Sequence, residues 1–364
     1  MNPLATYLDD LGPERIFHYY QPAAGLRAVV VLDTVRFGMT GGGVRMLPDI
    51  SLAEMVRLAR AMTYKFALLD LPVGGAKAGI WADPHAPDRV STMAAFLEAI
   101  EPLTSNGIYY PGADMGTSAA DFTALHGQAG QAQALGLQLY DGMPLEDQLT
   151  GYGVVVAAAT AMELDGRTLA GARVAIEGFG KVGGGAARFF AREGAQVVAV
   201  STVRGTRHDP AGLDIDALLA LRGEHGDAAV ERYPGGQLLP PAALFALPVD
   251  VLVPGARPDA ITAANVEAVN ARYVVPAANI PYGADVVARL HARGIVALPD
   301  FVANAGGVLA GVVGLQGGNA DDAFRTVRDR VSGNVRRVQQ RAVAGGTDPV
   351  AAAVALARER LRSL

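Results

Sequence analysis

The most constraining part of this sequence is residues 173–201, RVAIEGFGKVGGGAARFFAREGAQVVAVS. An apolar β-branched run is followed by a glycine turn, a helix-like run and a second apolar run, which predicts strand, turn, helix and strand. Gly178, Gly180 and Gly183 give the spacing G-x-G-x-x-G where the first strand would end and the helix begin. In this context the spacing predicts a dinucleotide-binding unit of a parallel sheet; the alternative is a glycine turn that binds nothing.

This loop defines the predicted contacts with a cofactor. The first glycine makes the turn, the second lets a pyrophosphate approach the backbone, and the start of the helix faces the phosphates. We therefore expect the cofactor to bind at Gly178, Phe179, Gly180, Lys181, Val182 and Gly183.

The end of the second strand decides between NAD and NADP in such units. An NAD site usually carries a carboxylate there, but this chain has STVR at 201–204, and its next carboxylate is Asp209. The hydroxyl of Thr202, with Arg204 and Arg207, would suit a 2′-phosphate, which leans the prediction toward NADP. NAD is the alternative, because arginines on an exposed turn are commonly solvated charges.

Short β-branched runs continue after this unit, at 249–256, 272–279 and 294–300, with helical stretches between them. Strands that alternate with helices predict a doubly wound, parallel α/β sheet. The last stretch, about 321–364, has heptad-like apolar spacing and predicts a pair of helices.

The first third of the chain reads as mixed α/β structure. RAVVVLDT at 27–34 predicts a strand, and TGGGVRMLP at 40–48 predicts a glycine turn. Residues 51–70 carry apolar side chains at helical spacing, and Ser51 with Glu54 predicts a capping box at the start of that helix. With 364 residues and a change of texture near residue 145, the chain is expected to form two α/β domains.

Composition excludes several classes of protein. Net charge is −5 with no strongly basic segment, so we expect no nucleic-acid partner. The chain has no cysteine, and its six histidines lack the spacing of metal ligands, so we expect no metal. The acidic N-terminus has no apolar core and is not a signal peptide, which favours a cytoplasmic protein. The uncharged run 301–320 holds six glycines, and we interpret it as a packed helix and its loop, with a membrane span as the alternative.

One lysine stands alone in an apolar segment. In LPVGGAKAGI, residues 71–80, Lys77 is the single charged residue and has glycines close on both sides. An ammonium group in an apolar wall is costly unless it is paired or loses its proton. Lys77 is therefore either a surface lysine on a glycine-rich turn or a lysine held in a cleft for chemistry.

Seven segments together resemble one known family. In this order and spacing they are similar to the amino-acid dehydrogenases of the glutamate, leucine, phenylalanine and valine group, and most to its leucine- and phenylalanine-type members: GGGVRMLP, MTYKFA, LPVGGAKAGI, YYPGADMGTS, LTGYGVVVAAATAMEL, VAIEGFGKVG and LPDFVANAGGVL. The resemblance implies reversible, NAD(P)-dependent oxidative deamination of an L-amino acid to the 2-oxo acid and ammonia, without a metal.

The same resemblance implies how the domains divide the work. Residues 1–145, completed by helices at about 330–364, would bind substrate and build a homo-oligomer. Residues 146–329 would form the Rossmann-type domain. The two α/β domains would lie around a cleft that closes over the substrate.

Three charged residues acquire catalytic roles from this resemblance. Lys77 would hydrogen-bond the substrate oxygen and activate water, which requires its pKa to fall toward working pH. Lys65 would pair with the substrate α-carboxylate and act as the second cation that lowers the pKa of Lys77. Asp114 would exchange protons with the amino nitrogen; its alternative role is a helix N-cap.

Further positions match the family by their place in the motifs. Gly42 and Gly43 would bring backbone against the substrate, Thr150 would hold the nicotinamide amide, and Asn279 would lie near the nicotinamide ribose and the substrate. Asn304 would be another cleft residue, although asparagines in such loops are commonly turn residues.

The substrate side chain is expected to be apolar, either aliphatic or aromatic. Glutamate-specific members carry a lysine where this chain has Gly41, and a serine where it has Gly311, close to Val308. Without these polar anchors a buried second carboxylate would be left unpaired. Two rival hypotheses are a catalytically silent NAD(P)-binding homologue and a dehydrogenase of the same fold that acts on an unusual amino acid.

Overall fold

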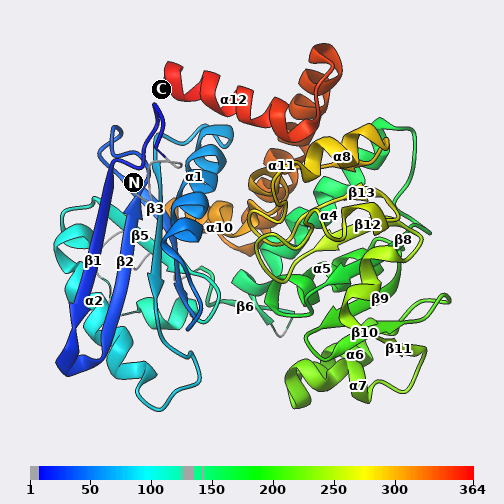
Figure 1. The fold of residues 1–364 in the computed structure, drawn as a ribbon, viewed down its shortest axis with the longest axis horizontal. Helices are drawn as coiled ribbons and strands as arrows, with labels where there is room; N and C mark the ends of the chain where they lie inside the picture. Colours follow the sequence, from blue (N-terminus) through cyan, green and yellow to red (C-terminus); the bar gives the residue numbers. More distant parts are fainter. Residues whose placement is uncertain (1–7, 124, 126–134, 142) are drawn as a thin grey trace. The chain divides into compact units, whose positions relative to one another are not determined.

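The structure is a computed structural model that describes residues 8–123, 125, 135–141 and 143–364. The chain divides into two compact units (Figure 1). Unit 1 comprises Met1–Gln138, Gly311–Asn319 and Ala357–Leu364, and unit 2 comprises Leu139–Ala310 and Ala320–Leu356. Of the C-terminal helices that the sequence analysis assigned to the first domain, only the segment from Ala357 onward groups with unit 1.

Unit 1 is built on a five-stranded sheet. Its strands are β1 (Arg15–Gln21), β2 (Leu26–Leu32), β3 (Thr40–Met46), β4 (Gly74–Ile80) and β5 (Tyr109–Ala113). They lie in the order β1-β2-β4-β3-β5. β2 is antiparallel to both β1 and β4, whereas β3 is parallel to both β4 and β5. The strand predicted at 27–34 is confirmed as β2.

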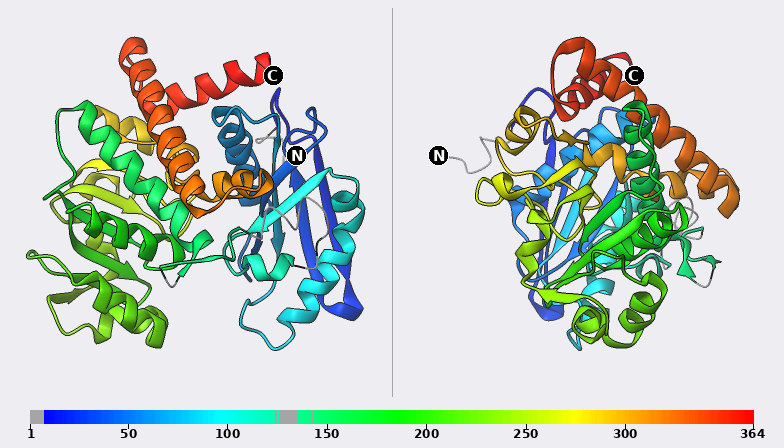
Figure 2. Two further views of the ribbon diagram at one scale, coloured as in Figure 1. Left: turned by 180° about the vertical axis from the view of Figure 1, so that it is seen from behind. Right: turned by 90° about the vertical axis from the view of Figure 1, so that its right-hand side faces the viewer.

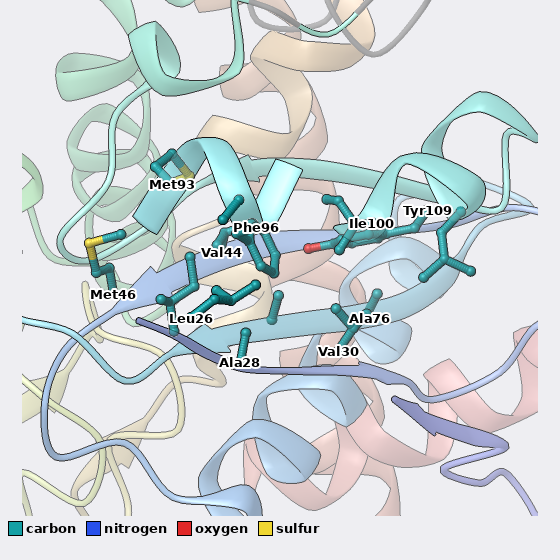
Figure 3. Packing of buried hydrophobic residues seen from close by; sticks show 14 of the residues in the cluster. Leu26, Ala28, Val30, Val44, Met46, Ala76, Met93, Phe96, Ile100 and Tyr109 are labelled. Atoms are coloured by element: carbon teal, nitrogen blue, oxygen red, sulfur yellow. The ribbon is translucent and has the colours of Figure 1, made fainter. Parts of the chain in front are cut away.

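The core of unit 1 lies between this sheet and helix α2 (Arg89–Ser105). Val30, Val44, Ala76 and Tyr109 come from four different strands and are fully buried together with Phe96 of α2 (Figure 3). Successive side chains of a strand point to opposite faces of the sheet. The residues that alternate with these core positions therefore face the other side, which helix α1 (Leu52–Leu68) covers.

Helix α1 begins as the sequence predicts. The hydroxyl of Ser51 accepts a hydrogen bond from the backbone N–H of Glu54 at 3.1 Å, which satisfies one of the free donors of the first turn. The carboxylate of Glu54, which a full capping box would use at the helix start, is ion-paired with Arg45 of β3 instead. The first turn of α1 is thereby tied to the sheet.

Residues 40–48 do not form the predicted glycine turn, because most of them belong to strand β3. Their glycines are required by close neighbours. A Cβ atom at Gly42 would lie 1.7 Å from the carbonyl oxygen of Ala76, and one at Gly41 would lie 2.9 Å from Cζ of Phe66. The need for glycine here comes from the packing of a second strand and of α1, which no local sequence pattern reveals.

Unit 2 holds the expected α/β sheet, with seven strands in the order β11-β10-β9-β8-β12-β13-β14. Their bounds are β8 (Arg173–Glu177), β9 (Gln196–Thr202), β10 (Gly205–His208), β11 (Gln237–Leu239), β12 (Val249–Pro254), β13 (Ala271–Val274) and β14 (Val296–Ala297). Strands β9, β8, β12, β13 and β14 are parallel, which confirms the predicted sheet. β10 and β11 add an antiparallel edge that the sequence analysis did not anticipate.

Helices flank this sheet, and Figure 2 shows the long helix α11 beside α4. Helices that lie wholly in unit 2 are α4 (Leu145–Leu164), α5 (Lys181–Arg192), α6 (Ile215–His225), α7 (Ala229–Arg232), α8 (Val286–Ala292), α9 (Asp300–Ala303) and α11 (Ala320–Gly345). Helices α10 (Gly306–Leu315) and α12 (Pro349–Ser363) cross a unit boundary, and a two-stranded ribbon of β6 (Leu139–Tyr140) and β7 (Met143–Pro144) precedes α4. The pair of helices predicted for the C-terminal stretch is confirmed as α11 and α12. Among the described residues, no helix is both long enough and apolar enough to span a membrane.

Candidate active site

Lys77 lies in the middle of β4, and its glycine neighbours explain how it becomes buried. A Cβ atom at Gly75 would lie 2.1 Å from the carbonyl oxygen of Ala59 in α1, and one at Gly79 would lie 2.4 Å from Cδ1 of Ile50. These glycines let α1 and the segment before it press directly on the strand, so Lys77 is only 2% exposed. The alternative of a surface lysine on a turn is therefore wrong.

Asp114 is the residue that Lys77 meets. Its Oδ2 atom lies 2.6 Å from Nζ of Lys77. Asp114 directly follows β5, and its backbone N–H donates to the hydroxyl of Thr117, which in turn donates to the carbonyl oxygen of Val44. The next helical turn has Ser118 as its N-cap, so Asp114 is not the helix cap that the alternative interpretation offered.

Arg45 completes the group, and the sequence analysis missed it. Its Nε atom lies 3.0 Å from the same Oδ2 atom of Asp114, and its Nη1 atom is ion-paired with Glu54 at the start of α1. Arg45 is 2% exposed. The four side chains form a cluster of two buried cations and two partly exposed anions that joins β3, β4, α1 and the end of β5.

This cluster shifts the pKa values of both predicted catalytic groups. Burial lowers the pKa of Lys77 below its usual value, and the positive charge of Arg45 lowers it further, against the opposing attraction of Asp114. Burial alone would raise the pKa of Asp114, but Arg45 and Lys77 hold it well below its usual range. Arg45 is thus a cation beside Lys77 that the sequence did not reveal, and the role of Lys65 as a second cation stays a prediction.

Lys65 lies near the end of α1, the helix packed on β4, and is 4% exposed. The chain contains only three lysines, Lys65, Lys77 and Lys181, and all three are predicted site residues. Arginine supplies every other basic side chain except the histidines. Lysine is the cation whose pKa shifts readily on burial, so its restriction to these positions is consistent with a chemical role.

The glycines of β3 differ in what their missing side chains face. A Cβ atom at Gly43 would lie 2.9 Å from Cβ of Asp114 and 3.1 Å from Nζ of Lys77, so Gly43 leaves room at the charged cluster itself. At Gly41 the neighbours are Phe66 and Val73, which are apolar. The wall beside Gly41 therefore carries rings and methyl groups.

The glycine loop of unit 2 has the geometry of a phosphate-binding turn. Gly178 has a φ of +81°, and a Cβ atom there would lie 3.0 Å from the backbone of Ala256. A Cβ atom at Gly183 would lie 1.8 Å from the carbonyl oxygen of Gly178, whereas one at Gly180 would have nothing within 4 Å. The loop is tight on the inside and open at Gly180, directly before the N-terminus of α5. A phosphate group needs this combination of open backbone and free N–H donors.

The remaining loop residues have unequal exposure. Phe179 is 2% exposed, so only its backbone is available to a ligand, whereas Lys181 is exposed and Val182 is partly buried. The loop follows β8, the strand at which the sheet order switches. The chain adds β9, β10 and β11 on one side of β8 and then β12 on its other side. Such a switch point is the usual ligand site of these sheets.

The turn between β9 and β10 corrects one part of the prediction. Arg207 is 7% exposed, and its guanidinium donates to the backbone carbonyl oxygens of Val230 and Glu231, at 2.8 and 3.0 Å. It is therefore a structural arginine rather than a ligand for a 2′-phosphate. The hydroxyl of Thr202 donates to the carbonyl oxygen of Asp227 at 2.8 Å, and Arg204 is exposed at the tip of the turn.

Asn279 and Asn304 lie together. Nδ2 of Asn304 donates to Oδ1 of Asn279 at 3.1 Å and to the carbonyl oxygen of Ala277 at 3.2 Å. The next residue, Ile280, has φ of +44°, a conformation that is strained for a β-branched side chain. Its N–H donates to the buried carboxylate of Asp300 at 2.8 Å, so Asp300 holds the strained loop beside Asn279.

The contact between helices α4 and α10 places the side chain of Thr150 beside the start of α10. A Cβ atom at Gly306 would lie 2.0 Å from the carbonyl oxygen of Leu149, so the start of α10 touches the backbone of α4. The hydroxyl of Thr150 then lies beside Gly307. Val308 and Gly311 are both partly buried and lie three residues apart on α10, which places them on one face of that helix.

The described residues contain no group of three or more His, Asp or Glu side chains that could hold a metal ion. His126 lies outside the described residues.

Family models match two parts of the chain. Residues 142–363 match the Glutamate/Leucine/Phenylalanine/Valine dehydrogenase model, and residues 13–131 match the model described as Glu/Leu/Phe/Val dehydrogenase, dimerisation domain. A glutamate dehydrogenase from Thermotoga maritima is 37% identical over 292 residues, which are 76% of this chain and 69% of that protein. An NADP(+)-dependent glutamate dehydrogenase from Pyrobaculum calidifontis is 34% identical over 283 residues, 74% of this chain and 67% of that protein.

Solved structures share the fold. The hetero-hexameric glutamate dehydrogenase from Thermus thermophilus, in its Leu-bound form, has a TM-score of 0.84 and 28% identity, covering 98% of this chain and 90% of its own. L-tryptophan dehydrogenase from Nostoc punctiforme has a TM-score of 0.68 with 24% identity and covers 98% of each chain, which shows a shared fold only. The two matched ranges together span most of the chain and include all seven segments that carried the resemblance in the sequence. The chain therefore belongs to the glutamate/leucine/phenylalanine/valine dehydrogenase family.

Proposed function

We propose that this protein catalyses the reversible oxidative deamination of an L-amino acid with an apolar side chain. The products are the 2-oxo acid, ammonia and reduced NAD(P). The observation that carries the proposal is the buried contact of 2.6 Å between Lys77 and Asp114. The family membership and the phosphate-binding geometry at Gly180 support it.

The two charged groups suit the two proton transfers of this reaction. An amino acid must lose protons from its ammonium group before its α-carbon can give up a hydride, and the carboxylate of Asp114 would accept one of them. When bound, NAD(P) accepts the hydride. Water must then attack the resulting iminium carbon, and Lys77 in its uncharged form would remove the proton from that water. The lowered pKa of Lys77 increases the fraction of this form at neutral to alkaline pH.

Lys65 and Gly43 would position the substrate at this cluster. Lys65 would pair with the α-carboxylate, for which a compact ammonium group is well suited. Gly43 leaves the space beside Nζ of Lys77 and Cβ of Asp114 that a reacting α-carbon needs. Gly42, in contrast, packs against Ala76, and its absent side chain is explained by that contact.

Two positions support an apolar substrate. At Gly41, where glutamate-specific relatives carry a lysine, Phe66 and Val73 occupy the neighbourhood, and a longer side chain would displace the phenyl ring. Gly311 offers no polar side chain. A γ-carboxylate buried beside these groups would be left without a partner, which costs selectivity by orders of magnitude. The named curated relatives are glutamate dehydrogenases, so activity on glutamate is the result that would contradict this part.

The phosphate loop, with Thr150 and Asn279, would hold the cofactor. Gly178, Gly180 and Gly183 form the open turn, and the exposed Lys181 at the N-terminus of α5 adds a positive charge beside it. Arg204 is the arginine of the β9–β10 turn that is exposed, and we propose that it favours NADP. Arg204→Ala should therefore weaken NADP binding while leaving NAD binding unchanged, as measured by fluorescence titration of each cofactor.

A homo-oligomer in the cytoplasm is also proposed. Its support is the match of residues 13–131 to a dimerisation domain. Light scattering of the purified protein would measure its size in solution.

The first experiment is an absorbance assay for reduced nicotinamide. The protein is mixed with NAD or NADP and a panel of L-amino acids that includes leucine, phenylalanine, tryptophan and glutamate, at several alkaline pH values, with Lys77→Ala alongside. We expect turnover with an apolar amino acid and loss of turnover in the variant. Cofactor binding without turnover on any amino acid would instead favour the silent homologue, and turnover on an uncommon amino acid alone would favour the unusual-substrate alternative.

A further inference from the structure

We propose that Arg45 is a positioning residue for the reaction: anchored by Glu54, it holds Asp114 beside Lys77 and supplies the permanent positive charge that tunes this pair. The inference rests on the proposed function for its catalytic meaning. Its structural part concerns only the four charged side chains of unit 1 and is tested separately below.

The geometry at Asp114 supports this role. Both cations approach one oxygen, with Nε of Arg45 at 3.0 Å and Nζ of Lys77 at 2.6 Å from Oδ2. Among the described residues, no side chain or backbone group has a hydrogen bond to Oδ1 of Asp114. The Asp114 side chain is 14% exposed. Arg45 therefore fixes the carboxylate through one oxygen and leaves the other for a substrate ammonium group.

Arg45 is itself anchored by a second ion pair. Its Nη1 atom pairs with Oε1 of Glu54, whose backbone N–H is held by the Ser51 hydroxyl at 3.1 Å. A single guanidinium thus spans from the first turn of α1 to the end of β5. The planar guanidinium of arginine has several donors and can bind Glu54 and Asp114 at once. The ammonium group of a lysine, on its flexible side chain, does this less well.

Arg45 also acts on the pair through its charge. Among the described residues, the groups that act on Lys77 and Asp114 include Arg45 from β3, Glu54 from α1 and Tyr109 from β5. Tyr109 is neutral, since burial raises its pKa, and its hydroxyl donates to the carbonyl oxygen of Gly42. Arg45 is therefore the cation that lowers the pKa of Lys77 while it keeps Asp114 ionised. An arginine stays protonated and does not exchange a proton with the pair, because its pKa lies far above neutral pH and is raised further here.

Lysine-selective NMR provides a direct test, because the chain has only Lys65, Lys77 and Lys181. Protein carrying [ε-13C]lysine should give three side-chain signals, and Lys77→Arg and Lys181→Arg identify two of them. In Arg45→Gln the titration midpoint of Lys77 should rise by about one pH unit. The reason is that the variant removes a positive charge that contacts the same oxygen of Asp114 as Lys77 and disfavours the charged form of Lys77. Glu54→Gln removes an anion and should move the midpoint in the opposite direction.

The activity measured on these variants should follow the same logic. Arg45→Gln should lower kcat about 10- to 100-fold, with a smaller change in KM, and shift the pH profile of kcat/KM toward alkaline pH. Arg45→Lys restores the charge and should recover part of both effects. The matched control is Arg89→Gln, which breaks another partly buried ion pair of unit 1, with Asp121, and should leave the pH profile in place.

Two results would overturn the inference. One is a folded Arg45→Gln protein in which the titration midpoint of Lys77 does not rise. The other is an equal shift in Arg89→Gln, which would mean that any loss of a buried pair has this effect. If Arg45→Gln does not fold, Glu54→Gln decides: the titration midpoint of Lys77 should fall in that variant, and an unchanged midpoint would contradict the inference. Because the NMR titration needs no turnover, failure of the proposed reaction would leave this test intact and would be recognised separately.

Discussion

Substitution of Gly43 by alanine should reduce kcat about tenfold in a protein that still folds. The added methyl carbon would lie 2.9 Å from Cβ of Asp114, 3.1 Å from Nζ of Lys77 and 3.2 Å from the carbonyl oxygen of Ala113. Carbon atoms in van der Waals contact lie about 3.5–4.0 Å apart, so the two charged side chains must move away by several tenths of an ångström. The φ angle of Gly43 lies outside the left-handed region, so alanine meets no backbone strain, and the effect comes from space alone.

The magnitude follows from this displacement. A misplacement of about 1 Å at a reacting group can reduce the rate about 100-fold, so a shift of about half that size should reduce kcat about tenfold. Overpacking by one methyl group costs about 1–3 kcal/mol of unfolding free energy, and of the near atoms only Nζ of Lys77 lies at the end of a flexible side chain. We therefore expect Gly43→Ala to fold with reduced stability and with a kcat about tenfold lower.

Steady-state kinetics with the best amino acid and equilibrium denaturation would measure both quantities. Gly333→Ala serves as the control, because Gly333 is exposed in α11 and an added Cβ atom would meet nothing within 4 Å. That change should stabilise the protein by about 0.5–1 kcal/mol without altering kcat. Wild-type kcat in Gly43→Ala, with the same stability, would refute the placement of the reacting atoms at Gly43.

Two further predictions concern groups outside the charged cluster. Burial tends to raise the pKa of Asp9, but hydrogen bonds and the charge of Arg60 lower it to about 2, so its stabilisation exists above pH 3.8 and is lost as pH falls toward 2. Asp9→Asn should therefore destabilise the protein by about 0.5 kcal/mol at pH 7 and by nothing near pH 2, since this side chain is 39% exposed; equal destabilisation at both pH values in denaturation curves would contradict this. Asp300→Ala should lower the unfolding free energy by about 1–3 kcal/mol, because the N–H of Ile280 loses its acceptor, and should weaken cofactor binding in a titration. Unchanged affinity would show that the strained loop does not position Asn279.

Much of unit 2 was predictable because its signals are local. The turn at Gly178, the helix that follows and the parallel strands each depend on residues that are adjacent in sequence. The backbone preferences of such residues do not depend on the rest of the fold. The antiparallel edge was missed, as was the burial of Arg207. Its guanidinium is used by carbonyl groups more than 20 residues away, so no pattern around position 207 could separate it from the exposed Arg204.

Unit 1 shows where sequence reasoning ends. The run at 40–48 looked like a turn, because three consecutive glycines have no preference for a strand when considered alone. It is a strand because it pairs in parallel with β4 and β5, and its glycines give room to the close neighbours from α1 and β4. Lys77 was recognisable as an unusual charge, but Arg45 was not, because an arginine beside a proline-containing loop carries no local mark of burial.

The sequence by itself therefore determined the two α/β units, the nucleotide loop and the identity of Lys77 and Asp114 as residues that need an explanation. Only the tertiary structure decided that these two meet at 2.6 Å, that Arg45 shares the same carboxylate oxygen, and that Glu54 anchors it. The physical reason is that backbone preferences act between neighbours in the chain. Desolvation and charge pairing act between neighbours in space, and the paired residues here come from three strands or strand ends and one helix.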